Sequence, residues 1–180
     1  GWEKFALLGH SMGGAIATLA AATFPERMRA LLLIDALGPL TATAEEAPTR
    51  LLQHLNAAAR LATKKPAHYT SIEQALAARV KAGQFEQPEN IRGVVERSLK
   101  EVRSDGEVFY TWRSDARLTL PSAMRLTDEQ VMAFLQRLSC PTFLVVPDHG
   151  LAEAAKNKAT FQAAVADLDV KTMAGFHHVH

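Results

Sequence analysis

A glycine-rich turn near the start of the chain constrains the fold more than any other feature of the sequence. Residues 9–13 read Gly-His-Ser-Met-Gly, follow an apolar run at 4–9 and precede an alanine-rich run at 12–24. This pattern predicts a buried strand that passes directly into a helix. Because side chains would collide in so tight a turn, we expect glycine to be required at both Gly9 and Gly13.

The turn belongs to a strand-helix-strand unit. Pro25 is expected to end the helix, and the apolar run at 30–35 predicts a second buried strand. Two strands joined through a helix lie parallel and are connected by a right-handed crossover. The chain is therefore predicted to be an α/β protein, with a mostly parallel sheet and flanking helices.

The same alternation returns near the C-terminus. Thr127 and Gln130 have the spacing of a capping box, which predicts the start of a helix. Apolar runs at 142–146 and 169–173 predict two more strands, with a helix over 152–166 between them.

The middle of the chain interrupts this alternation. Helical patterns cover 44–63, 71–81 and 88–102. We see no strand signal from about residue 43 to residue 103, and we therefore expect a long helical insertion between the two parts of the sheet.

Composition narrows the classes of function. The 20 Lys and Arg residues against 19 Asp and Glu give a formal net charge of +1, so a nucleic acid is not an expected partner. No apolar run approaches the roughly 18 residues that a membrane span needs. The single cysteine cannot form an internal disulfide and fits a reducing compartment, so we expect a cytoplasmic protein.

The glycine-rich turn also predicts a chemistry. A turn of this kind projects the Ser11 hydroxyl above the C-terminal edge of the sheet and aims the first backbone N–H groups of the helix at the same point. We therefore predict Ser11 as a nucleophile and the N–H of Met12 as a donor to an oxyanion. The alternative interpretation is a glycine-rich turn with an incidental serine.

A serine hydroxyl becomes a good nucleophile only when a base takes its proton. The last predicted strand is followed by His177, His178 and His180. We favour His177 as the base, with His178 as the second choice. The competing interpretation is a metal site, but zinc ligands usually come from more than one segment, so we expect no metal.

Two aspartates are candidates for the acid that orients the base. Asp148 comes just after the apolar run at 142–146, and Asp35 ends the run at 30–35. A carboxylate in either place can hold the imidazole and stabilise its cation. We prefer Asp148 and keep Asp35 as the alternative, since Asp35 can also be explained as a turn or capping residue.

These motifs together resemble the α/β-hydrolase superfamily. The resemblance rests on the strand and Gly-His-Ser-Met-Gly-Gly turn, on Phe-Pro-Glu-Arg at 24–27 and on Leu-Ile-Asp at 33–35. Within the superfamily, the chain resembles the serine hydrolase-like proteins. That second resemblance rests on the segments 35–39, 113–118, 149–150 and 175–180.

The resemblance implies an architecture and a function. It implies a hydrolase core formed by 1–39 and 126–180, with 40–125 as a helical cap over the active site. It also implies a carboxylesterase-like serine hydrolase that cleaves a small ester or related acyl substrate through an acyl-enzyme, with a Ser-His-Asp triad. The substrate-binding candidates are His10, Tyr110, Trp112 and Met124.

Other functions remain open at this point. The same serine could serve a C–C bond hydrolase, an acyltransferase or a lyase. A non-catalytic binding protein on a hydrolase fold, or an inactive truncated product, are alternatives of another class. No cofactor is expected, because the glycines match neither a dinucleotide fingerprint nor a phosphate-binding loop. The oligomeric state stays open.

Both ends of the chain suggest a C-terminal portion of a longer protein. The chain has no initiating Met, begins almost inside a strand and stops inside a motif. A complete superfamily member carries several strands before the nucleophile strand, and one of their loops supplies the second oxyanion donor. Without them, we expect Phe5 and Leu7 on the strand edge to face solvent or a partner chain.

Overall fold

The chain folds into two compact units. The computed structural model describes residues 1–83, 87–104, 106–152 and 157–179. One unit, here called the sheet unit, comprises Gly1–Ala47 and Arg125–Val179. The other, called the insertion unit, comprises Pro48–Met124.

The sheet unit is built on four parallel strands. Their order across the sheet is β1 (Phe5–His10), β2 (Met28–Ile34), β5 (Thr142–His149) and β6 (Leu168–Phe176). Its helices are α1 (Met12–Thr23), α5 (Asp128–Leu135) and α6 (Lys158–Ala163), with 3₁₀ turns at Pro25–Arg27 and Ala44–Glu46. The α/β architecture with a parallel sheet is confirmed.

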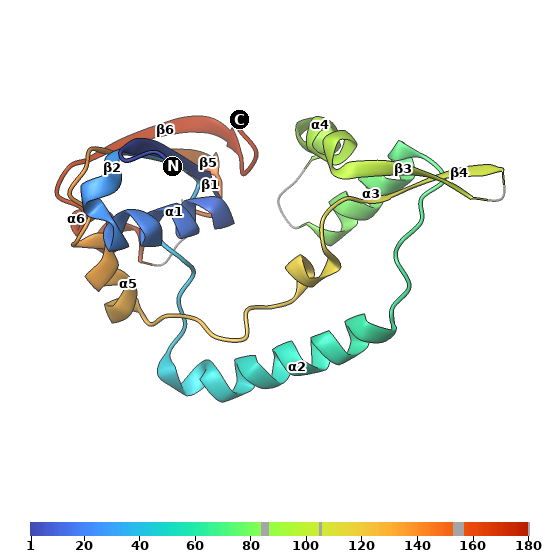
Figure 1. Cartoon of the computed structure of the whole chain (residues 1–180), viewed down its shortest axis with the longest axis horizontal. Coiled ribbons are helices and arrows are strands. Elements are labelled where there is room, and N and C mark those ends of the chain that lie inside the picture. The colour runs from blue at the N-terminus through green and yellow to red at the C-terminus, as the bar shows by residue number, and fades with distance from the viewer. Residues whose placement is uncertain (84–86, 105, 153–156, 180) are drawn as a thin grey trace. The chain divides into compact units, whose positions relative to one another are not determined.

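The core of the sheet unit lies between one face of the sheet and the three helices, which Figure 1 shows together on that side. Leu31 and Leu33 of β2 and Leu144 of β5 are at most 1% exposed and pack in this layer. Burying one such side chain contributes about 1.5–3 kcal/mol. Alanines on α1, including Ala17, bring that helix close to the sheet.

The opposite face of the sheet carries an exposed apolar row. Leu8, Leu32 and Phe143 pair in register across three strands and are 62%, 36% and 44% exposed. The expectation that Phe5 and Leu7 would be the exposed residues of β1 was wrong, because both pack against the helix-side core. Side chains alternate between faces along a strand, so Leu8 takes the outer position.

The insertion unit contains strands as well as helices. Its elements are α2 (Ala47–Thr63), α3 (Ile72–Ala82), α4 (Pro88–Ser98), β3 (Leu99–Ser104), β4 (Glu107–Trp112) and a 3₁₀ helix at Ala116–Thr119. A small core forms where α3, α4 and β3 meet, from Ala75, Leu76, Ile91, Val95 and Leu99.

The expectation of a helix over 88–102 was wrong beyond Ser98. From Leu99 the chain forms β3, which pairs antiparallel with β4. The missed signal was the Asp-Gly pair at 105–106, a strong hairpin marker, which is followed by a run rich in aromatic residues at 107–112. Gly106 has a φ of +82°, which glycine adopts without the strain imposed by a Cβ atom.

Predicted helix caps are confirmed in both units. The Thr127 side chain accepts the N–H of Gln130, and the Gln130 side chain accepts the N–H of Thr127, which completes the capping box. Ser71 caps α3 by accepting the N–H of Gln74.

The turn between β1 and α1 is tight, but its steric demand differs from the expectation. A Cβ at Gly9 would lie 2.6 Å from the Gly13 carbonyl carbon, so glycine is required there. Gly13 faces open space, and the expectation for that position was wrong. Gly14 is the second crowded position, since a Cβ would lie 3.0 Å from the Ala36 Cβ.

This contrast predicts opposite effects of the same substitution at two neighbouring positions. Gly9→Ala should lower the free energy of unfolding by roughly 3 kcal/mol, because the added methyl group meets backbone that cannot move away. Gly13→Ala should raise it by about 0.5–1 kcal/mol, since alanine favours the helix. Urea denaturation of the two variants checks this, and equal losses of stability would contradict it.

Candidate active site

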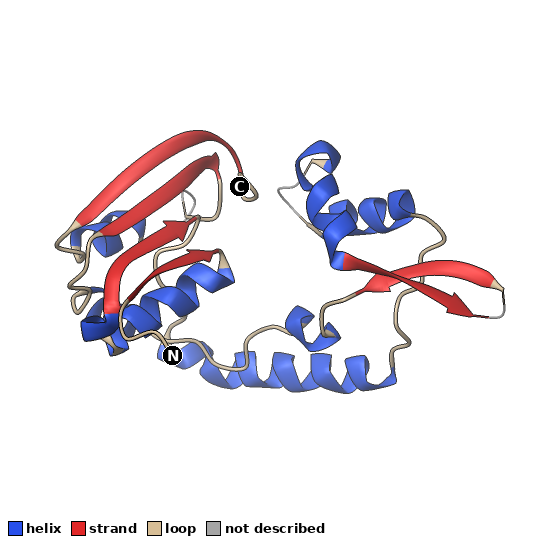
Figure 2. Ribbon diagram, turned by 45° about the horizontal axis from the view of Figure 1, so that its top comes forward, coloured by secondary structure: helices blue, strands red, loops and turns tan. Residues whose placement is uncertain are grey.

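Four of the candidate residues lie at the carboxyl ends of the four parallel strands. Ser11 follows β1, Asp35 follows β2, Asp148 lies at the end of β5, and His177 follows β6. Figure 2 shows the four arrowheads at one edge of the sheet. Parallel strands bring such residues together, which is why this edge carries the sites of open α/β sheets.

Asp35 and His177 form a direct pair. The Nδ1–H of His177 donates to Oδ2 of Asp35 at 2.5 Å. Asp35 is 1% exposed, so its carboxylate is withdrawn from water, whereas the His177 side chain is 14% exposed. A neutral imidazole that donates from Nδ1 keeps a free lone pair on Nε2, where it can accept a proton.

Two backbone amides complete the surroundings of the Asp35 carboxylate. The N–H of Leu151 donates to Oδ2 at 2.8 Å, and the N–H of Ala152 donates to Oδ1 at 2.7 Å. Burial by itself would raise the pKa of Asp35, but the hydrogen bonds from His177 and from the two amides outweigh it and hold the pKa below the usual value. Asp35 is therefore an ionised, buried carboxylate at neutral pH.

Ser11 and Asp35 share an unusual backbone conformation. Both have a φ of 52°, and they are the two non-glycine residues with positive φ within the described ranges. Hydrogen bonds to neighbouring strands hold them, from Ser11 N–H to the Ile34 carbonyl at 3.0 Å and from Asp35 N–H to the Val145 carbonyl at 2.9 Å. Strained residues of this kind concentrate at functional sites.

Asp148, the preferred acid of the sequence analysis, is not brought to the imidazole of His177. Its Oδ1 accepts the N–H of Gly175 at 2.9 Å instead. The strand β5 continues to His149, three residues beyond the predicted end at Val146, and places Asp148 beside the bend that precedes His177. The position next to the imidazole belongs to the alternative, Asp35.

The remaining histidines of the site surround His177. His10 donates from Nε2 to the main-chain carbonyl of His177 at 2.8 Å, and the two rings lie 4.5 Å apart between centroids. The ring of His178, the second choice for the base, lies 4.8 Å from that of His177. The contact with the buried carboxylate distinguishes His177 from His178.

Two of the three substrate-binding candidates in the insertion unit, Tyr110 and Trp112, take part in its packing. Trp112 donates from Nε1 to the Tyr69 hydroxyl at 3.2 Å, and Tyr110 exchanges two backbone hydrogen bonds with Tyr69. Met124 is 62% exposed. Contact of Tyr110, Trp112 and Met124 with a substrate stays a prediction, as does the role of His10 in binding.

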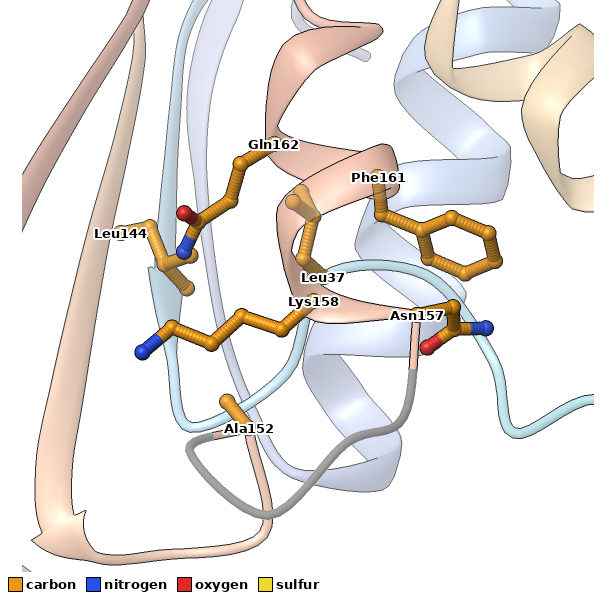
Figure 3. Close-up of a pocket in the computed structure, with 7 residues that line it drawn as sticks. All are labelled: Leu37, Leu144, Ala152, Asn157, Lys158, Phe161 and Gln162. Carbon is orange, nitrogen blue, oxygen red and sulfur yellow. The ribbon is translucent and has the colours of Figure 1, made fainter.

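A small hollow lies between β5 and α6, on the helix side of the sheet (Figure 3). It is lined by Leu37, Leu144, Ala152, Asn157, Lys158, Phe161 and Gln162. Its volume of about 30 Å³ has room for only a few water molecules. This hollow is therefore too small for an acyl substrate.

Two kinds of feature are absent from the described part of the chain. None of its helices combines the length and the apolar character needed to cross a bilayer. Within the same residues, no three His, Cys, Asp or Glu side chains are grouped as metal ligands would be.

Curated relatives carry serine hydrolase-like names. One from Dictyostelium discoideum is 28% identical over 147 residues, which are 80% of this chain and 40% of that protein. Another, from Danio rerio, is 24% identical over 192 residues, with 99% of this chain and 56% of that protein. The chain thus spans about half the length of these relatives.

A solved structure and a family model point the same way. The crystal structure of a hypothetical protein from Pseudomonas aeruginosa PAO1 has a TM-score of 0.84 and 36% identity, over 99% of this chain and 62% of that chain. The model of the alpha/beta hydrolase fold family matches residues 1–149. Since this match covers most of the chain, and the strand-turn-helix unit has the structure that the fold requires, the chain belongs to the alpha/beta hydrolase fold family.

Proposed function

We propose that this chain carries the catalytic groups of a serine hydrolase that acts on an ester or related acyl substrate. The observation that carries the proposal is the buried pair of Asp35 and His177 at 2.5 Å, at the strand ends that also hold Ser11. The serine hydrolase-like names of the relatives support the same class. Carboxylesterase-like specificity, a small-molecule substrate and a cytoplasmic location are parts of the proposal.

Each group has one role in this reaction. His177 takes the proton of the Ser11 hydroxyl on Nε2, and the Ser11 oxygen attacks the carbonyl carbon of the substrate. Asp35 keeps the imidazole in the Nδ1–H form and stabilises the imidazolium cation that results. The imidazolium then gives its proton to the leaving group, which departs. The acyl group stays bound to the Ser11 oxygen as an acyl-enzyme.

The second half of the reaction uses the same groups. His177 takes a proton from a water molecule, the hydroxide attacks the acyl carbon, and Ser11 regains its proton as the acid leaves. The N–H of Met12 is the proposed donor to the negatively charged oxygen in both halves. It is the first residue of α1, so its amide has no carbonyl partner within the helix.

The alternatives with the same serine differ in the acceptor or in the bond that breaks. Transfer to an alcohol in place of water, or cleavage of a C–C bond, would use the same pair of Asp35 and His177. We place hydrolysis first because it needs no second substrate site.

A fluorophosphonate probe tests the nucleophile directly. We expect covalent labelling at Ser11, located by peptide mass spectrometry, and no labelling of Ser11→Ala, because only a serine activated by a base reacts quickly with such probes. Ser139, which precedes the buried Cys140, provides the matched control: Ser139→Ala should label like the unaltered chain. Labelling elsewhere in the chain would refute the assignment.

The assignment of the acid has its own test. Asp35→Asn should slow labelling of Ser11 by about four orders of magnitude, since the amide favours the wrong tautomer of the imidazole. Asp169→Asn, at an exposed position of β6, should leave the rate unchanged. A normal rate in Asp35→Asn would exclude Asp35 as the acid.

The buried charge also predicts how stability changes with pH. A carboxyl group whose pKa is lowered on folding adds stability above its unfolded pKa, here 3.8, and loses it as the pH falls through the lower, folded pKa. The stability advantage of the unaltered chain over Asp35→Asn should therefore shrink between about pH 5 and about pH 2. Each pKa unit by which folding lowers the pKa of this carboxyl group corresponds to about 1.4 kcal/mol in the free energy of unfolding. Urea denaturation across this range checks the prediction, and a constant difference would contradict it.

A further inference from the structure

One short segment contacts both Asp35 and the stretch of chain just before His177. Residues 148–152 connect the end of β5 to the chain that follows it. This segment includes Asp148, the aspartate that does not contact the imidazole of His177. It also holds the two amides that reach Asp35.

The second half of the segment binds the carboxylate of Asp35, the proposed acid. The N–H groups of Leu151 and Ala152 each bind a different oxygen of the Asp35 carboxylate. Gly150 makes this approach possible, because a Cβ there would lie 2.7 Å from the Asp35 Cγ. The N–H of Gly150 donates to the carbonyl of Pro147 at 3.0 Å and closes the turn.

The first half of the segment contacts the residues just before His177, the proposed base. Asp148 accepts the N–H of Gly175, two residues before His177. The ring of His149 stacks on that of Phe176 at 5.3 Å and 27°. Gly175 has a φ of +144°, so the chain bends there in a conformation that favours glycine.

We propose that residues 148–152 form a clamp that sets the position of Asp35 against that of His177, with Asp148 and Gly150 as its positioning residues. Neither residue touches the imidazole. Their effect on catalysis rests on the proposed function, whereas their effect on the geometry of the pair does not. A misplacement of a catalytic group by about 1 Å can slow a reaction by about a hundredfold, so a clamp of this kind has a measurable consequence.

Two variants of the whole 180-residue chain disrupt the contacts to Asp35 and the contacts to Gly175 separately. Gly150→Ala places a methyl group against the Asp35 carboxylate and should slow labelling of Ser11 by roughly a hundredfold. Asp148→Ala frees the Gly175 N–H and should slow it by about tenfold. Asp148→Asn keeps an oxygen acceptor and should restore most of the rate, which a requirement for the negative charge would not allow.

Matched controls make the same chemical changes elsewhere. Gly93→Ala lies in α4, where a Cβ meets only the tip of the Arg97 side chain, and Asp169→Ala removes an exposed carboxylate from β6. Both should label at the rate of the unaltered chain.

A second readout does not depend on reactivity. The proton between His177 Nδ1 and Asp35 should give a strongly downfield signal in the NMR spectrum, and both clamp variants should shift or broaden it while the controls leave it unchanged. If Ser11 is not labelled in the unaltered chain, the proposed function fails, and this signal alone decides the clamp.

The clamp is overturned if Gly150→Ala and Asp148→Ala both keep the labelling rate and the Nδ1 proton of the unaltered chain. Should Gly150→Ala fail to fold, Asp148→Ala decides, because its side chain is about half exposed and its loss leaves the core intact. A shifted signal together with a slowed rate in Asp148→Ala supports the clamp.

Discussion

The buried carboxylate of Asp35 is the constraint on which the site depends. Removing an ionised carboxylate from water is costly, by several kcal/mol even after the protein relaxes, unless charged or polar donors replace the lost hydration. Here three donors do so: the imidazole of His177 and the amides of Leu151 and Ala152. Each comes from a different part of the chain than Asp35, so the charge ties the ends of β2, β5 and β6 together.

The strained backbone at Ser11 and Asp35 follows from the same arrangement. Both residues leave a strand with positive φ, a conformation that costs about 1–3 kcal/mol and persists only when the surroundings impose it. The imposing contacts are backbone hydrogen bonds to β2 and β5, which the well-packed helix side of the sheet keeps in place. The packed core therefore keeps these two turns in their strained conformation.

Asp35 and Asp148 lie at the same edge of the sheet but make different contacts. Asp35 is buried and contacts the imidazole, whereas Asp148 is about half exposed and holds the backbone before it. Both groups are carboxylates at strand ends, and their chemistry is the same. Their different surroundings separate the proposed acid from the proposed positioning residue.

The sequence by itself determined the parallel strands, the strand-turn-helix unit, the helix caps and the candidates Ser11 and His177, because periodicity and turn chemistry act over a few neighbouring residues. It placed the steric requirement for glycine correctly at Gly9 but wrongly at Gly13, which faces open space, and it did not reveal how long β5 is. Only the tertiary structure decided which aspartate meets His177. Asp35 lies 142 positions away along the chain, and their pairing depends on where β5 ends and on how residues 150–152 turn back toward β2.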